Sequence, residues 1–164
     1  MKKVILVIVV AGTGIFSSCA QVTCKFSKAY AYFTVSMPGT QMVDEKGNPV
    51  PPIPVIERFI YIETTGPAIP KVVFVRYDTL LMKATVARIE GNTSSPGKNP
   101  ENYKPVILKA KKGNHLWRID LQPADESPMK ATAYRNIHVK ILRSGRSCVL
   151  RFKSEKELST FPRY

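Results

Sequence analysis

The chain has 164 residues, of which 44% are hydrophobic and 23% are charged. These values are ordinary for a globular protein of one domain with a substantial core, and they exclude the classes of extreme composition. The net charge of +13 favours anionic partners, and 13 prolines together with many β-branched residues favour strands and loops.

The first residues predict an export signal. Lys2 and Lys3 precede an uncharged, mostly apolar stretch at 4–16, and the small residues Ser17 and Ser18 follow it. Thirteen residues are too few to cross a bilayer as a helix, so this stretch alone is not a stable membrane anchor. A buried N-terminal strand is the alternative, and the basic start and the small-residue exit argue against it.

The segment Phe16-Ser17-Ser18-Cys19 resembles the lipobox of bacterial lipoproteins, although Phe16 differs from the aliphatic residue usual at that position. The resemblance covers this segment only. It implies cleavage before Cys19, which then carries acyl chains that hold the protein to a membrane. Ser18-Cys19-Ala20 also satisfies a small-x-small signal-peptidase site, and cleavage there would leave a soluble chain.

The resemblance implies a signal peptide at 1–18 and a lipidated tether at 19–25, and the strand patterning described below predicts a β-sandwich domain at 26–164. The protein is then exported and anchored in the cell envelope, on the periplasmic side or at the surface. An exported chain rarely meets nucleic acid, so the expected polyanion is anionic lipid, lipopolysaccharide or an acidic glycan. Alternatively, the lysines only solvate the surface and protect sheet edges.

Cys24 and Cys148 remain in the chain after either cleavage. Because exported proteins fold in an oxidising compartment, these two cysteines are predicted to form a disulfide. The alternative is that Cys148 is a small buried apolar residue, since alternation directs its side chain to the apolar face of a strand. The sequence leaves both interpretations open.

Strands are predicted from apolar patterning at 26–36, 58–64 and 71–77. A strand with a bend is predicted at 79–90, where the composition also fits a helix. Long stretches rich in turn-forming residues are predicted as loops at 40–56 and 91–102. A single helical turn is predicted at 154–157.

Two hairpins complete the pattern, one at 104–122 and one at 136–153. In the first, Gly113-Asn114 forms the loop and sets Ala110 opposite Trp117, Leu108 opposite Ile119 and Val106 opposite Leu121. In the second, Ser144-Gly145 sets Ile141 opposite Cys148, Val139 opposite Leu150 and Ile137 opposite Phe152. About eight short strands predict an all-β, antiparallel two-sheet sandwich of immunoglobulin-like architecture.

Basic side chains fall on the outward faces of both hairpins, where opposed like charges favour a bound anion. The candidates for anion binding are Lys109, Lys111, Arg118, His138, Lys140 and Arg151. The candidates for stacking on sugar rings are Tyr30, Tyr32 and Trp117, although core filling is the favoured role for Trp117.

No catalytic or metal motif is evident. His115 and His138 are the only histidines, and no cluster of carboxylates or cysteines accompanies them, so no metal and no cofactor are predicted. The predicted function is that of a non-enzymatic, envelope-anchored lipoprotein that serves as a binding or assembly module for an unknown protein or glycan. The alternative is a secreted glycan- or polyanion-binding domain.

Overall fold

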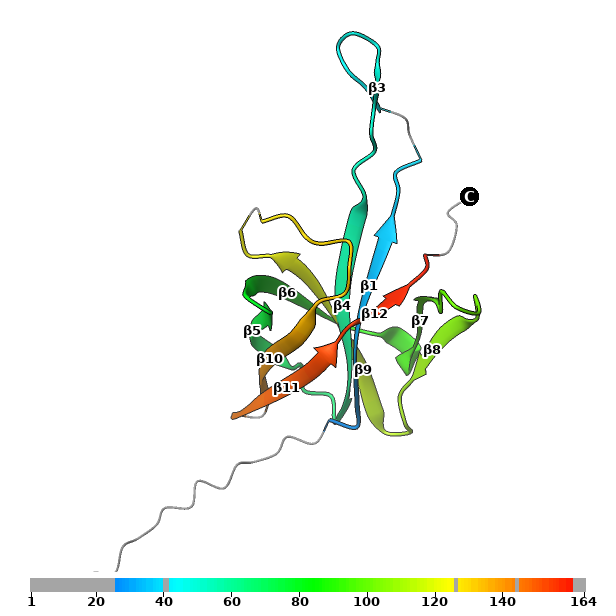
Figure 1. Cartoon of the computed structure of the whole chain (residues 1–164). Helices are drawn as coiled ribbons and strands as arrows, with labels where there is room; N and C mark the ends of the chain where they lie inside the picture. The colour runs from blue at the N-terminus through cyan, green and yellow to red at the C-terminus, as the bar shows by residue number, and fades with distance from the viewer. Residues whose placement is uncertain (1–25, 40–41, 126, 144, 161–164) are drawn as a thin grey trace, which may run out of the picture.

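The computed structural model describes residues 26–39, 42–125, 127–143 and 145–160, which form an all-β protein (Figure 1). Its strands are β1 (Lys28–Ser36), β2 (Met42–Val43), β3 (Pro49–Val50), β4 (Val55–Thr65), β5 (Lys71–Tyr77), β6 (Leu80–Arg88), β7 (Thr93–Lys98), β8 (Pro105–Lys109), β9 (Asn114–Pro123), β10 (Arg135–Arg143), β11 (Arg146–Ser154) and β12 (Lys156–Leu158). A 3-10 turn, η1 (Glu90–Asn92), precedes β7. Within these ranges, no helix is long and apolar enough to cross a membrane.

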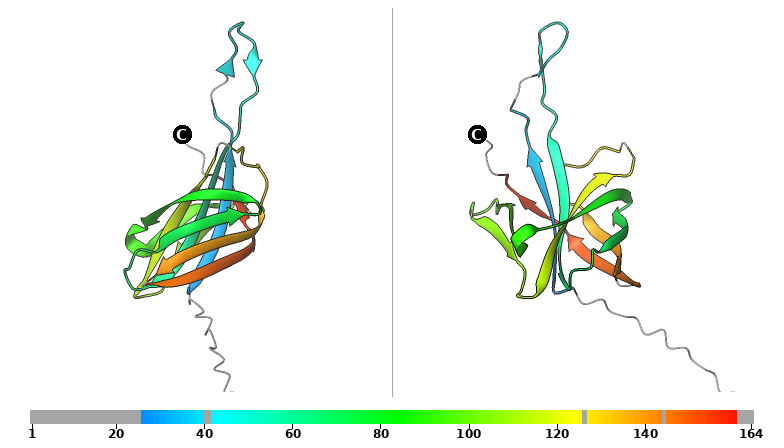
Figure 2. Two further views of the ribbon diagram at one scale, coloured as in Figure 1. Left: turned by 90° about the vertical axis from the view of Figure 1, so that its left-hand side faces the viewer. Right: turned by 180° about the vertical axis from the view of Figure 1, so that it is seen from behind.

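Eight strands form one curled sheet in the order β11-β10-β5-β6-β9-β4-β1-β12 (Figures 1 and 2). Neighbouring strands are antiparallel except β1 and β12, which are parallel. The two edge strands are consecutive in the chain, because only Glu155 separates β11 from β12. The chain therefore pairs with β10 before Glu155 and with β1 after it.

The curl gives the sheet an inner and an outer face, each with its own apolar cluster. The inner cluster includes Ile60, Trp117 and Ile119, which are almost fully buried. On the outer face, the small sheet β7–β8 covers β4, and Leu108 packs there with Tyr61. Strand β4 is therefore buried on both faces, which accounts for its unbroken apolar run.

The antiparallel all-β class is confirmed, and so is the register of the last hairpin, where Ile141 lies opposite Cys148 and Ile137 opposite Phe152. Ser144, in the loop of this hairpin, lies outside the described residues. The immunoglobulin-like arrangement of two sheets is not confirmed, because eight strands are hydrogen-bonded into one sheet.

The hairpin predicted at 104–122 is wrong. Strand β8 pairs with β7, whereas β9 pairs with β4 on one edge and with β6 on the other. At the turn between β8 and β9, the N–H of Ala110 donates to the carbonyl of Asn92 (3.0 Å), and the N–H of Lys111 donates to the carboxylate of Glu63 (3.0 Å). A strand has two edges, so β4 and β6 leave none on β9 for β8.

The helical turn predicted at 154–157 is also wrong, because this segment is extended and continues into β12. Two stretches predicted as loops contain short strands. The stretch 40–56 contains the pair β2–β3, and 91–102 contains β7. The two-residue strands β2 and β3 are too short to show a periodic pattern, and β7 carries Ser, Pro and Gly in place of alternating apolar residues.

An arm formed by residues 37–39 and 42–54 projects from one end of the sheet, and the described chain begins at the opposite end (Figure 1). The carboxylate of Asp44 orders the tip by accepting the N–H groups of Lys46 (2.9 Å) and Asn48 (2.8 Å). Val43 and Ile53 are 61% and 78% exposed, so the arm presents apolar side chains to solvent.

Candidate functional site

Strands β5, β10 and β11 are neighbours, and they place three basic residues in one row on the outer face. His138 of β10 lies directly opposite Arg151 of β11 on one side and Arg76 of β5 on the other. The two arginines are exposed and His138 is half-buried. Figure 2 (left) looks onto these strands.

Lys140 occupies the next outward position on β10, between Phe74 and Val149. Both flanking apolar side chains are exposed. We call the surface formed by Arg76, His138, Lys140 and Arg151 the basic face. It combines cationic groups with apolar surface at its side.

In the described part of the chain, the four residues of the basic face make no ion pair with a carboxylate. Arg76 and Arg151 carry like charges and repel each other across His138. The strands that carry Arg76 and Arg151 are separated by β10, so they lie about 10 Å apart. An anionic ligand with several charges would relieve the repulsion along the row.

The structure brings together only three of the six predicted anion-binding residues. His138, Lys140 and Arg151 come together, whereas Lys109 belongs to β8 and Lys111 to the following turn. Sequence reasoning missed Arg76, because it falls within a strand that was recognised by its apolar run. The alternation of Val75 and Arg76 indicates that Arg76 faces outward, but only the pairing of β5 with β10 places it beside His138.

Arg118, the sixth candidate, is already engaged. Its Nε donates to Asp120 (2.7 Å), and its guanidinium lies 4.6 Å from the centre of the Phe59 ring. The carboxylate of Asp120 already balances the positive charge of Arg118 that an anionic ligand would bind. Arg118 is therefore not part of an anion site in this structure.

Two of the three candidate rings for sugar stacking are buried, and for Trp117 this agrees with the favoured prediction of core filling. Trp117 is 2% exposed in the inner cluster, where its Nε1–H donates to the hydroxyl of Thr64 (2.8 Å), and Tyr32 is 5% exposed on the outer side. Burial raises the pKa of Tyr32 to about 12. Tyr30 is half-buried and stacks on Tyr32, with ring centres 6.1 Å apart. Buried rings cannot offer a face to a sugar, and Trp117 fills the core.

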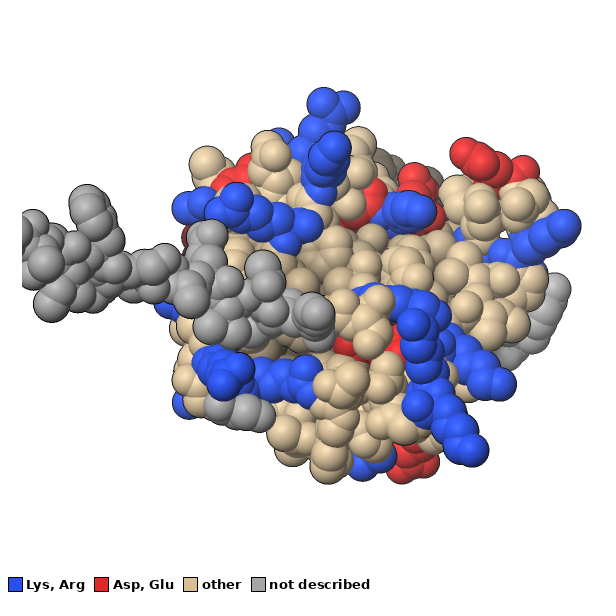
Figure 3. All heavy atoms as spheres, turned by 90° about the horizontal axis from the view of Figure 1, so that it is seen from below, with Lys and Arg blue, Asp and Glu red and all other residues tan. Residues whose placement is uncertain are grey.

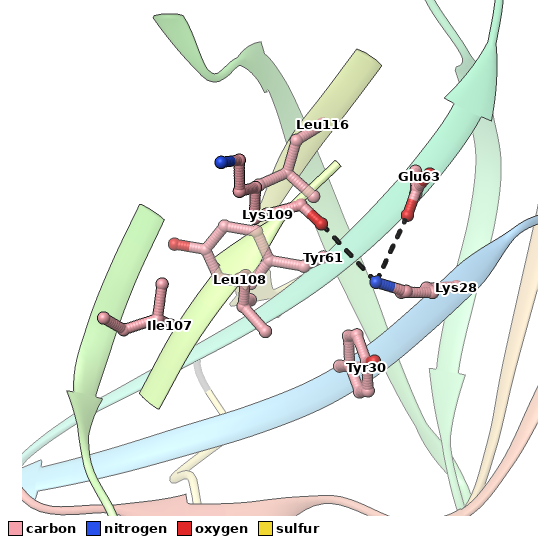
Figure 4. A pocket seen from close by; sticks show the side chains of 8 residues that line it. All are labelled: Lys28, Tyr30, Tyr61, Glu63, Ile107, Leu108, Lys109 and Leu116. Carbon is pink, nitrogen blue, oxygen red and sulfur yellow. Dashed lines mark hydrogen bonds and ion pairs between the residues drawn. The ribbon is translucent and has the colours of Figure 1, made fainter. Parts of the chain in front are cut away.

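A small pocket lies where β1, β4 and β8 meet (Figure 4). Its volume of about 40 Å³ suits a water molecule rather than an organic substrate. Glu63 lines the pocket, where Lys28 Nζ lies 3.9 Å from one carboxylate oxygen and 3.5 Å from the carbonyl of Lys109. Burial works to raise the pKa of Glu63, but hydrogen bonds from Asn114 and the Lys111 N–H hold that pKa below its usual value.

A larger groove, of about 580 Å³, lies between β12 and the loop after β7. Tyr32, Val106 and Leu158 form its apolar part, and Glu101 and Glu157 contribute negative charge. The groove therefore differs in chemistry from the basic face. Its mixed lining identifies no particular ligand.

Arg58 of β4 and Glu155, the residue between β11 and β12, form a buried ion pair. Arg58 also donates to the carbonyl of Thr132 (3.0 Å) and lies 4.4 Å from the centre of the Tyr134 ring. Burial lowers the pKa of Arg58. Both charged side chains are enclosed by protein, so we interpret the pair as a structural element.

Among the described residues, no group of three or more His, Cys, Asp and Glu side chains is placed to hold a metal ion. Cys148 is buried and disulfide-bonded. Cys19 and Cys24 lie outside the described residues, so the pairing with Cys24 and the lipidation of Cys19 remain predictions. Comparisons of the chain with known protein families, with curated proteins and with solved structures find no match.

Proposed function

We propose that the protein is a non-enzymatic, envelope-anchored binding module that takes a polyanion on its basic face. The observation that carries the proposal is the row Arg76–His138–Arg151, which has no carboxylate partner in the described structure. The lipobox-like segment that ends at Cys19 supports the anchoring.

The chemistry of the face favours anionic groups with several oxygens. Arginine presents a planar fork of N–H donors that matches carboxylate, phosphate and sulfate, and lysine adds a mobile point charge. The exposed Phe74 and Val149 flank Lys140 and add apolar contact surface. Acidic glycans and lipopolysaccharide are complementary to this face, because both carry repeated anionic groups on a less polar scaffold.

Binding is tested with a sulfated oligosaccharide and, separately, with lipopolysaccharide. The double variant Arg76→Gln/Arg151→Gln should bind about tenfold more weakly, because two exposed charged contacts contribute together about 1–2 kcal/mol. The matched control Lys46→Gln/Lys104→Gln removes two exposed lysines elsewhere and should bind like the unaltered protein. Equal weakening in both double variants would mean that net charge, not this face, drives binding. The probe that binds more tightly identifies the source of the anion.

Anchoring is tested by the intact mass of protein isolated from the membrane fraction. An acylated chain that begins at Cys19 supports the proposal, and Cys19→Ser should then move the protein to the soluble fraction when the membranes are washed with concentrated salt, which screens any charge-driven contact. A soluble chain that begins at Gln21 would support the second candidate, a secreted polyanion-binding domain.

Assembly with another protein is a further candidate function, favoured by the projecting arm. Its ordered tip and the exposed Val43 and Ile53 are features of a protein-binding element. The double substitution Val43→Ser/Ile53→Ser should release a co-purifying protein without altering polyanion binding.

A further inference from the structure

We infer that the end of the sheet where the described chain begins is a membrane-docking surface, which binds the anionic headgroups of the bilayer that holds the lipid anchor. The inference rests on the proposed anchoring at Cys19 and concerns a surface distinct from the basic face. We call this surface the tether end.

Strand pairing brings several chain segments to the tether end. Thr65 at the end of β4 lies opposite Asn114 at the start of β9, and Lys71 at the start of β5 lies opposite Leu142. The turn between β10 and β11, flanked by the pair Arg143–Arg146, lies at the same end. The cations carried by these segments are Lys71, Lys111, Lys112, Arg143 and Arg146.

Positive charge dominates this end. Figure 3 shows Lys and Arg side chains on several sides of the place where the described chain begins, with fewer Asp and Glu side chains between them. The five cations of the tether end make no ion pair in the described structure. Glu63 is 1% exposed, and its single charge interacts with both Lys28 and Lys111, so it offsets only part of the positive charge of this end.

An apolar side chain is exposed at the same end of the sheet. Ile69 is 71% exposed in the loop that joins β4 to β5, between Pro67 and Pro70. Prolines restrict the loop, and Arg143 braces its start by donating to the hydroxyl of Thr65 (3.1 Å). An exposed apolar side chain at an end rich in lysine and arginine is the composition that inserts into the interface of an anionic bilayer.

The tether provides the reason to choose a membrane over another polyanion. Phe26 packs against the inner cluster, and six residues separate it from Cys19. Even fully extended, this stretch spans at most about 25 Å. A lipid on Cys19 therefore keeps the tether end close to headgroups at high effective concentration.

The test uses the chain from residue 19 with Cys19→Ser, so that no acyl chain contributes. Co-sedimentation with vesicles of phosphatidylcholine and phosphatidylglycerol should greatly exceed that with phosphatidylcholine alone. It should be lost near 1 M salt, where the Debye length falls to about 3 Å. The variant Lys111→Gln/Lys112→Gln/Arg146→Gln should partition at least about tenfold more weakly, as expected if each cation near the surface adds to binding.

The control Lys46→Gln/Lys104→Gln/Lys156→Gln removes three exposed lysines from other parts of the surface and should retain binding. Ile69→Ser should weaken binding without changing its salt dependence. Equal binding to both vesicle types, or equal loss in both triple variants, would overturn the inference. If vesicle binding is lost in Arg76→Gln/Arg151→Gln and retained in the tether-end variant, the basic face contacts the membrane and the inference is wrong. The mass of Cys19 is measured separately, so failure of the anchoring is distinguished from failure of the docking.

Discussion

Glu155 forms an ion pair with Arg58, and both side chains are fully shielded from solvent. Glu155 is the one residue between β11, which pairs with β10, and β12, which pairs with β1. Glu155 also accepts the N–H of Tyr134 (2.8 Å), so one carboxylate connects β4, the segment before β10 and the junction of β11 and β12. The charge of Arg58 is further enclosed by the ring of Phe33, 5.0 Å away. The Arg58–Glu155 ion pair therefore holds the junction of β11 and β12 against β4.

Glu155→Gln should lower the free energy of unfolding by about 3–5 kcal/mol, because it leaves the buried guanidinium of Arg58 without a counter-charge. Chemical denaturation measures the loss. Glu157→Gln, an exposed change two residues away, should cost less than about 0.5 kcal/mol. Similar losses in both variants would show that the ion pair does not stabilise the junction.

Thr64→Val should destabilise the protein by about 1–3 kcal/mol, because the buried Nε1–H of Trp117 loses its acceptor. Trp117 is the only tryptophan, so its fluorescence reports both the unfolding transition and the local environment. Thr85→Val, at an exposed position on β6, is the control and should leave stability nearly unchanged. An unshifted midpoint in Thr64→Val would mean that the hydrogen bond contributes nothing.

Glu63 should make the protein sensitive to acid. Its pKa is lower in the folded chain than its ordinary value of 4.5, so the folded state binds fewer protons than the unfolded state. The stabilisation is complete above that ordinary value and is lost as the pH falls through the folded pKa. The stability difference between the unaltered protein and Glu63→Gln should therefore narrow below pH 4.5. Glu101→Gln, at an exposed position, serves as the control. If the free energies of unfolding of the unaltered protein and of Glu63→Gln change in parallel with pH, the lowered pKa of Glu63 is contradicted.

Cys24→Ser should abolish the disulfide of Cys148 and lower stability by about 4–5 kcal/mol in the chain-entropy model for a loop of this length. Peptide mapping after alkylation without reductant identifies the partner directly. Cys19→Ser serves as the control and should leave the bridge intact. If Cys19→Ser removes the bridge instead, the predicted pairing is wrong.

Local patterns in the sequence predicted the last hairpin correctly, because the Ser-Gly turn and the alternation of Ile137, Val139 and Ile141 specify the register without help from other strands. The partners of β9 could not be predicted in the same way. The turn at Gly113 resembles a hairpin loop, but the choice between β8 and the distant β4 and β6 depends on the order of the whole sheet.

The candidate site shows the same division between local and distant information. Outward positions of His138, Lys140 and Arg151 follow from alternation within one hairpin. The neighbouring Arg76 comes from another part of the chain, 62 positions before His138. Tyr32 was expected at the surface because alternation gives the face of a strand but not what covers that face. The structure buries it with Leu108 and Leu158.

The parallel pairing of β1 with β12 also sets the order in which the molecule can assemble. It joins Tyr32 to Lys156, 124 positions further along the chain. Contacts between such distant residues form slowly, because a long loop must close first. Until residues 146–158 are available, β1 keeps an unpaired edge and the guanidinium of Arg58 lacks its counter-charge. A nascent chain that stops before Glu155 therefore exposes the edge of β1, which is prone to aggregation. The fold is completed only when β12, a strand of three residues, has been synthesised and pairs with β1.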